Sequence, residues 1–337
     1  MHFSFAVGQE GRKTSSRRPR ACARRAFALA CAVLACAVSL SACSSANAGD
    51  GAGAAGDEGA TSGAAWQQPA QIARSAFDAN AASGQNGAAI DVSHANDGYV
   101  AASATADSRL KLLVECAGQS YNYDLPQDGT PLIAPANLGN GTYTVRVMRN
   151  TNADRYVELC RTTVDVALAS ERAPYLVPNC FCAYTDASAC VAKAREICAG
   201  AQNEGDVVRA VFDYITQNVT YDYDKAAQLS GTTGYVPDPD ATLQSGKGIC
   251  FDYASLGAAM LRSQGIPTKI VTGNVSPSNV YHAWIMVYID GTWKSARISV
   301  DQNTWSRIDL TFAATEGDSR AAGYVGDGST YTDRSTY

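Results

Sequence analysis

Cys250 opens a short amphipathic stretch, "CFDYASLGAAMLRS", shortly after Gly246 and Gly248. The apolar residues of this stretch recur at helical spacing, so we expect a helix that begins at Cys250 and stops at Gly265 and Pro267. The unpaired backbone N–H groups and the helix dipole at such an N-terminus favour a thiolate over a thiol. The sequence therefore predicts a nucleophilic cysteine. The alternative is a buried thiol that serves only packing.

A nucleophilic cysteine needs a base, and His282 is the histidine that we expect to supply it. His282 lies in "VYHAWIMVYIDG", a strand pattern ending in an Asp-Gly turn, whereas His94 lies in the turn-like "VSHANDG". A satisfied core histidine is the alternative interpretation of His282. A carboxylate that orients the imidazole would complete a triad. We predict Asp309, in "WSRIDLTFAA", for this role, with Asp301 as the fallback.

Residues 1–42 have the pattern of a lipoprotein signal peptide. Seven basic side chains precede an apolar run from Ala26 to Leu40 that is too short to span a bilayer, and "LSAC" follows. "LSAC" resembles the bacterial lipobox, which implies cleavage after Ala42 and lipid on Cys43. An ordinary secretory signal cut nearby is the alternative. We expect a chain anchored by lipid to the extracytoplasmic face of the cell membrane.

The charge of the chain excludes one class of partner. The chain has 27 Lys and Arg against 32 Asp and Glu, and without residues 1–42 it has 20 against 31, a formal charge of −11. Nucleic acid phosphates need clustered basic side chains, so we expect no nucleic acid partner. No later stretch is long and apolar enough to cross a membrane. We expect no metal ion and no cofactor, since the sequence lacks an EF-hand pattern.

Cysteine parity also points to Cys250. Seven cysteines remain after the leader and Cys43, and in an oxidising compartment six of them can pair. Cys190 and Cys198 lie about 12 Å apart on a helical pattern over 188–200, too far to form a disulfide with each other. A zinc site within 180–198 is the alternative, but no CxxC pair or nearby histidine supports it. The expected disulfides join Cys116 to Cys160, and Cys180 and Cys182 to Cys190 and Cys198.

Composition divides the rest of the chain into four parts. Residues 43–86 are rich in Ala, Gly and Ser and are expected to be a disordered linker. Residues 87–170 alternate polar and apolar side chains between turns, as in "GTYTVRVMRN", and predict a small β-sandwich-like module. Residues 175–314 show helical patterns and then strands, an α+β arrangement. Residues 315–337 form a polar C-terminal tail.

Three ordered motifs resemble those of the transglutaminase-like superfamily. They are "GKGICFDYASLGAAMLRSQGIPTKIVTG", "YHAWIMVYIDGTW" and "WSRIDLTFAA". The resemblance covers 175–314 and implies a papain-like α+β core, with helices packed on an antiparallel sheet. It also implies that Cys250 is the nucleophile, His282 the base and Asp309 the orienting carboxylate. The oxyanion donor stays open between the backbone N–H of Cys250 and the side chain of Tyr235.

These features predict a cysteine enzyme that attacks amide bonds through a thioester. With water as acceptor it would be a peptidase or amidase on cell-surface protein or cell-wall peptide, and we rank this reaction first. With a lysine amine as acceptor it would be a protein-crosslinking transglutaminase. A non-catalytic surface binding or adhesion protein is the third possibility, against which the complete Cys, His and Asp set argues.

Overall fold

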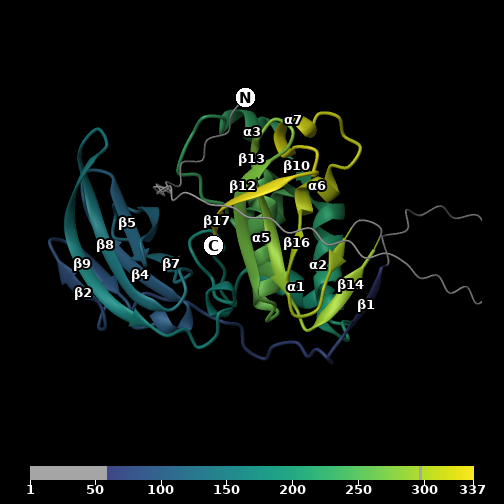
Figure 1. The fold of residues 1–337 in the computed structure, drawn as a ribbon, viewed down its shortest axis with the longest axis horizontal. Coiled ribbons are helices and arrows are strands. Elements are labelled where there is room, and N and C mark those ends of the chain that lie inside the picture. The colour runs from purple at the N-terminus through teal and green to yellow at the C-terminus, as the bar shows by residue number, and fades with distance from the viewer. Residues whose placement is uncertain (1–58, 296–297) are drawn as a thin grey trace, which may run out of the picture. The chain divides into compact units, whose positions relative to one another are not determined.

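The computed structural model describes residues 59–295 and 298–337, all within one unit of the chain (Figure 1). The predicted signal peptide, the predicted lipid site Cys43 and the first part of the predicted linker lie outside the described residues. Among the helices that the structure describes, none combines the length and the apolar character needed to cross a membrane.

Residues 83–166 form two four-stranded antiparallel sheets. Leu112, Val114 and Val145 are fully buried, whereas the side chains that alternate with them are half-buried, as expected for a strand with one face on the core. The two sheets contact each other where β3 lies against β8 and β9, and this confirms the predicted N-terminal β region. The first sheet has the order β2 (Ser83–Gln85), β3 (Ala88–Asp91), β4 (Tyr99–Ala104), β7 (Leu132–Pro135), and the second β6 (Gln119–Leu125), β5 (Leu110–Cys116), β8 (Gly141–Asn152), β9 (Arg155–Val166).

Helix α5 (Cys250–Ser263) is the central element of the C-terminal half. Every residue of α5 is buried, because the helix contacts strands β12 and β13 as well as helices α1, α2, α4 and α6. Most residues of α5 are small or apolar, which suits a helix that is covered on all sides. The sheet is antiparallel, so the predicted α+β class is confirmed. Its order is β16 (Trp305–Ile308), β13 (Val280–Tyr288), β12 (Thr268–Val275), β17 (Tyr331–Thr336).

The remaining elements surround this core. Strands β1 (Ala60–Gly63), β14 (Gly291–Lys294) and β15 (Ser299–Val300) form a small sheet, and β10 (Thr220–Tyr221) pairs in parallel with β11 (Lys247–Gly248). The helices are α1 (Ala189–Ile197), α2 (Glu204–Asn218), α3 (Tyr223–Gln228), α4 (Pro239–Ser245), α6 (Leu310–Ala314) and α7 (Ala322–Val325), with short 3-10 helices at Ala95–Asp97 and Ala173–Tyr175.

The described part of the predicted linker is ordered, which corrects the expectation of disorder over 43–86. Strand β1 pairs with β14, and the Thr61 hydroxyl donates to Asp206 over 2.7 Å. Ile72 is buried, and the Trp66 indole donates to the carbonyl of Gln264. The Ala-, Gly- and Ser-rich composition was misleading because backbone pairing in a sheet needs no large side chains. Trp66 and Ile72 provide the apolar contacts of this segment.

The C-terminal residues are also part of the fold and not a separate polar tail. Strand β17 is an edge strand that pairs with β12, and Tyr337 is fully buried. Tyr337 and Ile270 exchange two backbone hydrogen bonds of 2.8 Å. The segment looked polar because the side chains of an edge strand that face solvent are charged or hydroxylated.

The predicted disulfides are not formed: in the described chain the six cysteines in question are free thiols, and so is Cys250. Cys116 pairs with Tyr143 and Cys160 with Val147, on opposite edges of β8 and four residues apart along it. That separation is about 10 Å across the sheet and about 13 Å along it, well beyond the reach of a disulfide. Of the other four, Cys190 and Cys198 are completely buried, whereas Cys180 borders a pocket.

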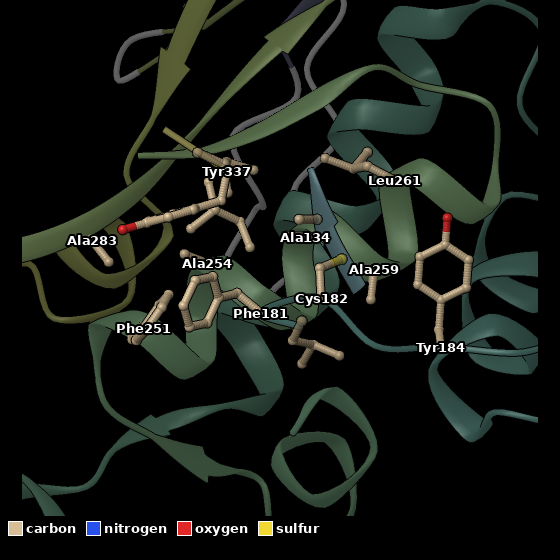
Figure 2. Close-up of a cluster of buried hydrophobic side chains, with 14 of the residues drawn as sticks. Ala134, Phe181, Cys182, Tyr184, Phe251, Ala254, Ala259, Leu261, Ala283 and Tyr337 are labelled. Carbon is tan, nitrogen blue, oxygen red and sulfur yellow. The ribbon is translucent and has the colours of Figure 1, made fainter. Parts of the chain in front are cut away.

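Figure 2 shows part of the buried cluster on which α5 rests. The ring centroids of Phe181 and Phe251 lie 5.4 Å apart, and those of Phe181 and Tyr337 lie 4.6 Å apart. These three rings come from the segment before α1, from α5 and from the end of β17. The cluster therefore ties three distant stretches of sequence together directly beside Cys250.

Candidate active site

Cys250 is the first residue of α5, with Ile249 as the N-cap, and its exposed fraction is 6%. The chain reaches this position through a tight approach. A Cβ on Gly248 would lie 2.7 Å from the Cβ of Asp252, so only glycine fits there. The sequence prediction of a helix that begins at this cysteine is confirmed.

The buried carboxylate of Asp252 fixes the start of the helix. Its Oδ2 accepts from the backbone N–H of Ile249 at 2.8 Å and from the Lys225 ammonium at 2.7 Å. Its Oδ1 accepts from the Tyr235 hydroxyl. Tyr235 therefore uses its only proton on Asp252 and is not a donor to an oxyanion, which leaves the backbone N–H of Cys250 as the candidate.

His282 lies on β13, opposite Gly273 of β12, and is fully buried. Its Nε2–H donates to Oδ2 of Asp309 over 2.8 Å. The ring nitrogen Nδ1 has no regular hydrogen-bond partner among the described residues. Because Nε2 is occupied, Nδ1 is the nitrogen that can exchange a proton with Cys250.

Asp309 is held from three sides. It is the N-cap of α6, where Oδ1 accepts from the backbone N–H of Phe312 over 2.8 Å. Oδ2 accepts from His282 and also from the hydroxyl of Tyr331, at 2.8 Å each. Burial raises the pKa of Asp309, but the charge of His282 and these hydrogen bonds outweigh it and lower the pKa. The carboxylate is therefore ionised.

The protonated form of His282 is strongly favoured. Burial lowers the pKa of this imidazole, but the charge of Asp309, followed by that of the Cys250 sulfur, raises it to about 10. The hydrogen bond to Asp309 acts in the same direction. The site is thus arranged to hold an imidazolium between a carboxylate and a sulfur.

The structure brings the three predicted side chains together and places Asp301, the alternative carboxylate, outside the site. Cys250, His282 and Asp309 interact as described above, from α5, β13 and the start of α6. Asp301 instead pairs with Lys294, and its side chain is 57% exposed.

Tyr331 belongs to the site but was missed by the sequence analysis. It lies in the segment that was expected to be a polar tail, and its ring packs edge-on against Trp284 with centroids 4.9 Å apart. The Arg307 guanidinium lies 3.8 Å from the ring centroid. The only signal for it was the alternation in "YTDRST", which has the period of a strand.

Tyr331→Phe is expected to slow a reaction at Cys250 about tenfold, because a hydrogen bond to the Asp309 carboxylate is lost. Its loss raises the pKa of Asp309, so the acid limb of the pH–rate profile should move to higher pH. The measurement is that profile, compared with Tyr156→Phe on β9 as control. Superimposable profiles for Tyr331→Phe and the wild type would refute a role for the hydroxyl.

Residues 191–310 match the family model of the transglutaminase-like superfamily, a segment that includes Cys250, His282 and Asp309. The predicted resemblance is confirmed for this segment. This segment is therefore similar to the transglutaminase-like core.

Two curated relatives match short segments. A UPF0252 protein of Methanocaldococcus jannaschii is 31% identical over 94 residues, which are 26% of this chain and 27% of that protein. An uncharacterized protein of Mycobacterium leprae is 33% identical over 79 residues, which are 20% of this chain and 28% of that protein. The matches therefore span little more than a quarter of the length of each relative.

Solved structures with some likeness include two whose descriptions state an activity. A Cytophaga hutchinsonii protein described as a candidate cysteine protease is 16% identical, with 70% of this chain and 80% of that chain covered and a TM-score of 0.34. Red sea bream transglutaminase is 11% identical, with 72% and 49% covered and a TM-score of 0.29.

Proposed function

We propose that this chain is a cysteine enzyme that attacks amide bonds of peptides or proteins and forms a thioester on Cys250. One observation carries the proposal: a fully buried imidazole, held by an ionised carboxylate at 2.8 Å, interacts with a cysteine at the start of a helix. A histidine that serves only packing does not need both a carboxylate and a cysteine as partners. Burying charged groups costs desolvation free energy, so this arrangement indicates a functional site.

The reaction begins with the Cys250 thiolate and the protonated His282. The sulfur attacks the carbonyl carbon, and the C–N bond then breaks while Nδ1–H of His282 protonates the departing amine. A thioester and a neutral imidazole remain. The imidazole then takes a proton from the incoming acceptor, and the oxygen or nitrogen of the acceptor attacks the thioester. The C–S bond breaks, the carboxylic acid or the new amide leaves, and the Cys250 thiolate is restored. Asp309 keeps the proton on Nε2 throughout, so that Nδ1 faces the sulfur.

We propose water as the acceptor, which makes the enzyme a peptidase or amidase. The "LSAC" motif supports a lipid anchor on Cys43 and a place on the extracytoplasmic face of the membrane, where surface proteins and cell-wall peptides are the available amides.

Iodoacetamide at pH 6 to 7 is expected to modify Cys250 at least about ten times faster than the other thiols, because only a thiolate reacts. Burial raises the pKa of each of the other six, that of Cys182 to about 11 and that of Cys198 to about 12. Peptide mapping by mass spectrometry identifies the modified residue. Equal modification of all seven, or amide cleavage that survives Cys250→Ala, would exclude the proposal.

A second experiment separates the two acceptors. The protein is incubated with casein and a fluorescent primary amine, and both label and new amino termini are measured. New termini or released ammonia without label mean hydrolysis, whereas incorporated label means transfer. Neither product, with Cys250 unreactive, would favour a binding protein.

A further inference from the structure

A pocket near Cys250 is lined partly by residues of the β-sandwich-like module. Phe251, which follows Cys250, and Tyr281, which precedes His282, both border it. The β module contributes Lys111 from β5 and Tyr123 from β6 to the lining of the same pocket. Burial raises the pKa of Tyr281, and the charge of Cys250 adds a smaller contribution in the same direction, so the pocket lies near the sulfur. A substrate at Cys250 would therefore meet the β module.

The chemistry of the walls selects an uncharged group. Aromatic rings form the interior, with the centroids of Tyr123 and Phe181 6.0 Å apart and those of Phe181 and Phe251 5.4 Å apart (Figure 2 shows the last two). The charged groups are paired with each other, since the Lys111 ammonium lies 2.7 Å from Asp124. A charged ligand group would find no free counter-ion among these side chains and would lose its hydration.

The size of the pocket selects a small group. The volume of the cavity is about 40 Å³. A cavity needs roughly 10–15 Å³ to hold one water, so about three water-sized groups fit. That number corresponds to the three or four carbon groups in the side chain of valine or leucine. An indole is too large.

The hydroxyl of Tyr123 indicates a polar contact at the same place. Tyr123 is 2% exposed and lines the pocket, and its hydroxyl has no hydrogen-bond partner among the described residues. Burial raises the pKa of this phenol well above its usual range, so it remains a donor. A buried donor without a partner costs free energy, and a carbonyl oxygen brought by a ligand would recover it.

We propose that this pocket is the subsite for an aliphatic side chain, of valine or leucine size, on the peptide that Cys250 attacks, and that Tyr123 donates to a backbone carbonyl of that peptide. The inference rests on the proposed function, because it takes Cys250 as the nucleophile. It gives the β module a role in choosing the substrate and makes Tyr123 and Val236 specificity-determining residues.

The test uses the full chain and acetyl-Ala-X chloromethyl ketones with X as Gly, Val, Leu, Trp or Lys. The Cys250 thiolate displaces chloride and forms a thioether, so the rate of alkylation reports how well X is accommodated. We expect the Val and Leu reagents to react at least about tenfold faster than the Gly, Trp and Lys reagents, the usual discrimination for a few methylene groups.

Two variants test the pocket itself. Val236 lines it and is 51% exposed, so Val236→Trp should fold, close the pocket and remove the preference for Val and Leu. Val157→Trp, at an exposed site on β9 (43% exposed), is the matched control and should change nothing. Tyr123→Phe should slow the Leu reagent about three- to tenfold without lowering the melting temperature, since the hydroxyl has no partner to lose.

Iodoacetamide, which carries no amino-acid side chain, distinguishes failure of the subsite from failure of the proposed function. If it modifies Cys250 rapidly in every variant while the five ketones react equally, the subsite is refuted and the proposed function stands. If Cys250 reacts with neither kind of reagent, the proposed function fails and the subsite fails with it.

Discussion

His282→Gln is expected to lower kcat/KM for a peptide amide by about a hundred- to ten-thousandfold, the range that a general acid and base contributes. The glutamine amide cannot take up or release a proton. It also carries no positive charge, so alkylation of Cys250 by iodoacetamide at pH 6 should slow at least about tenfold. The measurements are cleavage of a fluorogenic leucyl peptide amide and the alkylation rate of Cys250.

The control for this variant is His94→Gln. His94 bonds to Asp97 over 3.0 Å and stacks on Tyr99 with centroids 5.1 Å apart, in the β module. Its replacement should leave both rates unchanged. Melting temperatures of both variants show whether the loss comes from unfolding. Equal losses for the two histidines, or full alkylation of Cys250 in His282→Gln, would contradict the assigned role.

The site could be predicted from sequence where local pattern dictates geometry. Gly248 and Cys250 mark a helix start because a tight approach and a helical apolar period meet there. The alternation around His282 ends in an Asp-Gly turn, which defines a strand with one buried face. Asp309 stands directly before "LTF", and its type suits an N-cap. In each case the decisive contacts lie within a few residues.

Contacts between distant segments could not be predicted in this way. Tyr331 reaches Asp309 only because β17 pairs with β12, and nothing near residue 331 specifies that partner. The cysteine argument failed for the same reason, since parity counts thiols without placing them. Cys116 and Cys160 face the same core but stand on β5 and β9, with β8 between them. Strand order is a property of the whole sheet.

Asp309→Asn is expected to lower kcat/KM by up to about ten-thousandfold while the protein stays folded, because it reverses one hydrogen bond in a buried site. The asparagine Oδ1 can still accept from the backbone N–H of Phe312, so the cap of α6 is preserved. Its NH₂ group then faces Nε2 of His282, where the carboxylate had accepted a proton. The imidazole must accept there and carry its proton on Nδ1, so it cannot take one from Cys250.

The pH dependence gives this prediction a second, independent readout. Among the interactions that raise the pKa of His282 from its usual value of 6.5 to about 10, the charge of Asp309 is the largest. Without it, the alkaline limb of the pH–rate profile should move from near pH 10 toward neutral pH. The stability that the charged histidine gains from this partner is complete below pH 6.5 and is lost as the pH rises through about 10. The difference in unfolding free energy between wild type and Asp309→Asn should therefore shrink above pH 10.

Asp301→Asn is the matched control for Asp309→Asn, since it makes the same chemical change at an exposed carboxylate that pairs with Lys294. It should leave the rate and the alkaline limb unchanged. An unshifted limb in Asp309→Asn would mean that the imidazolium does not depend on this carboxylate. A similar loss in both variants would mean that overall charge, and not the bond to Nε2, governs the rate. Because the two variants have equal net charge, a difference between them isolates the contact at 2.8 Å.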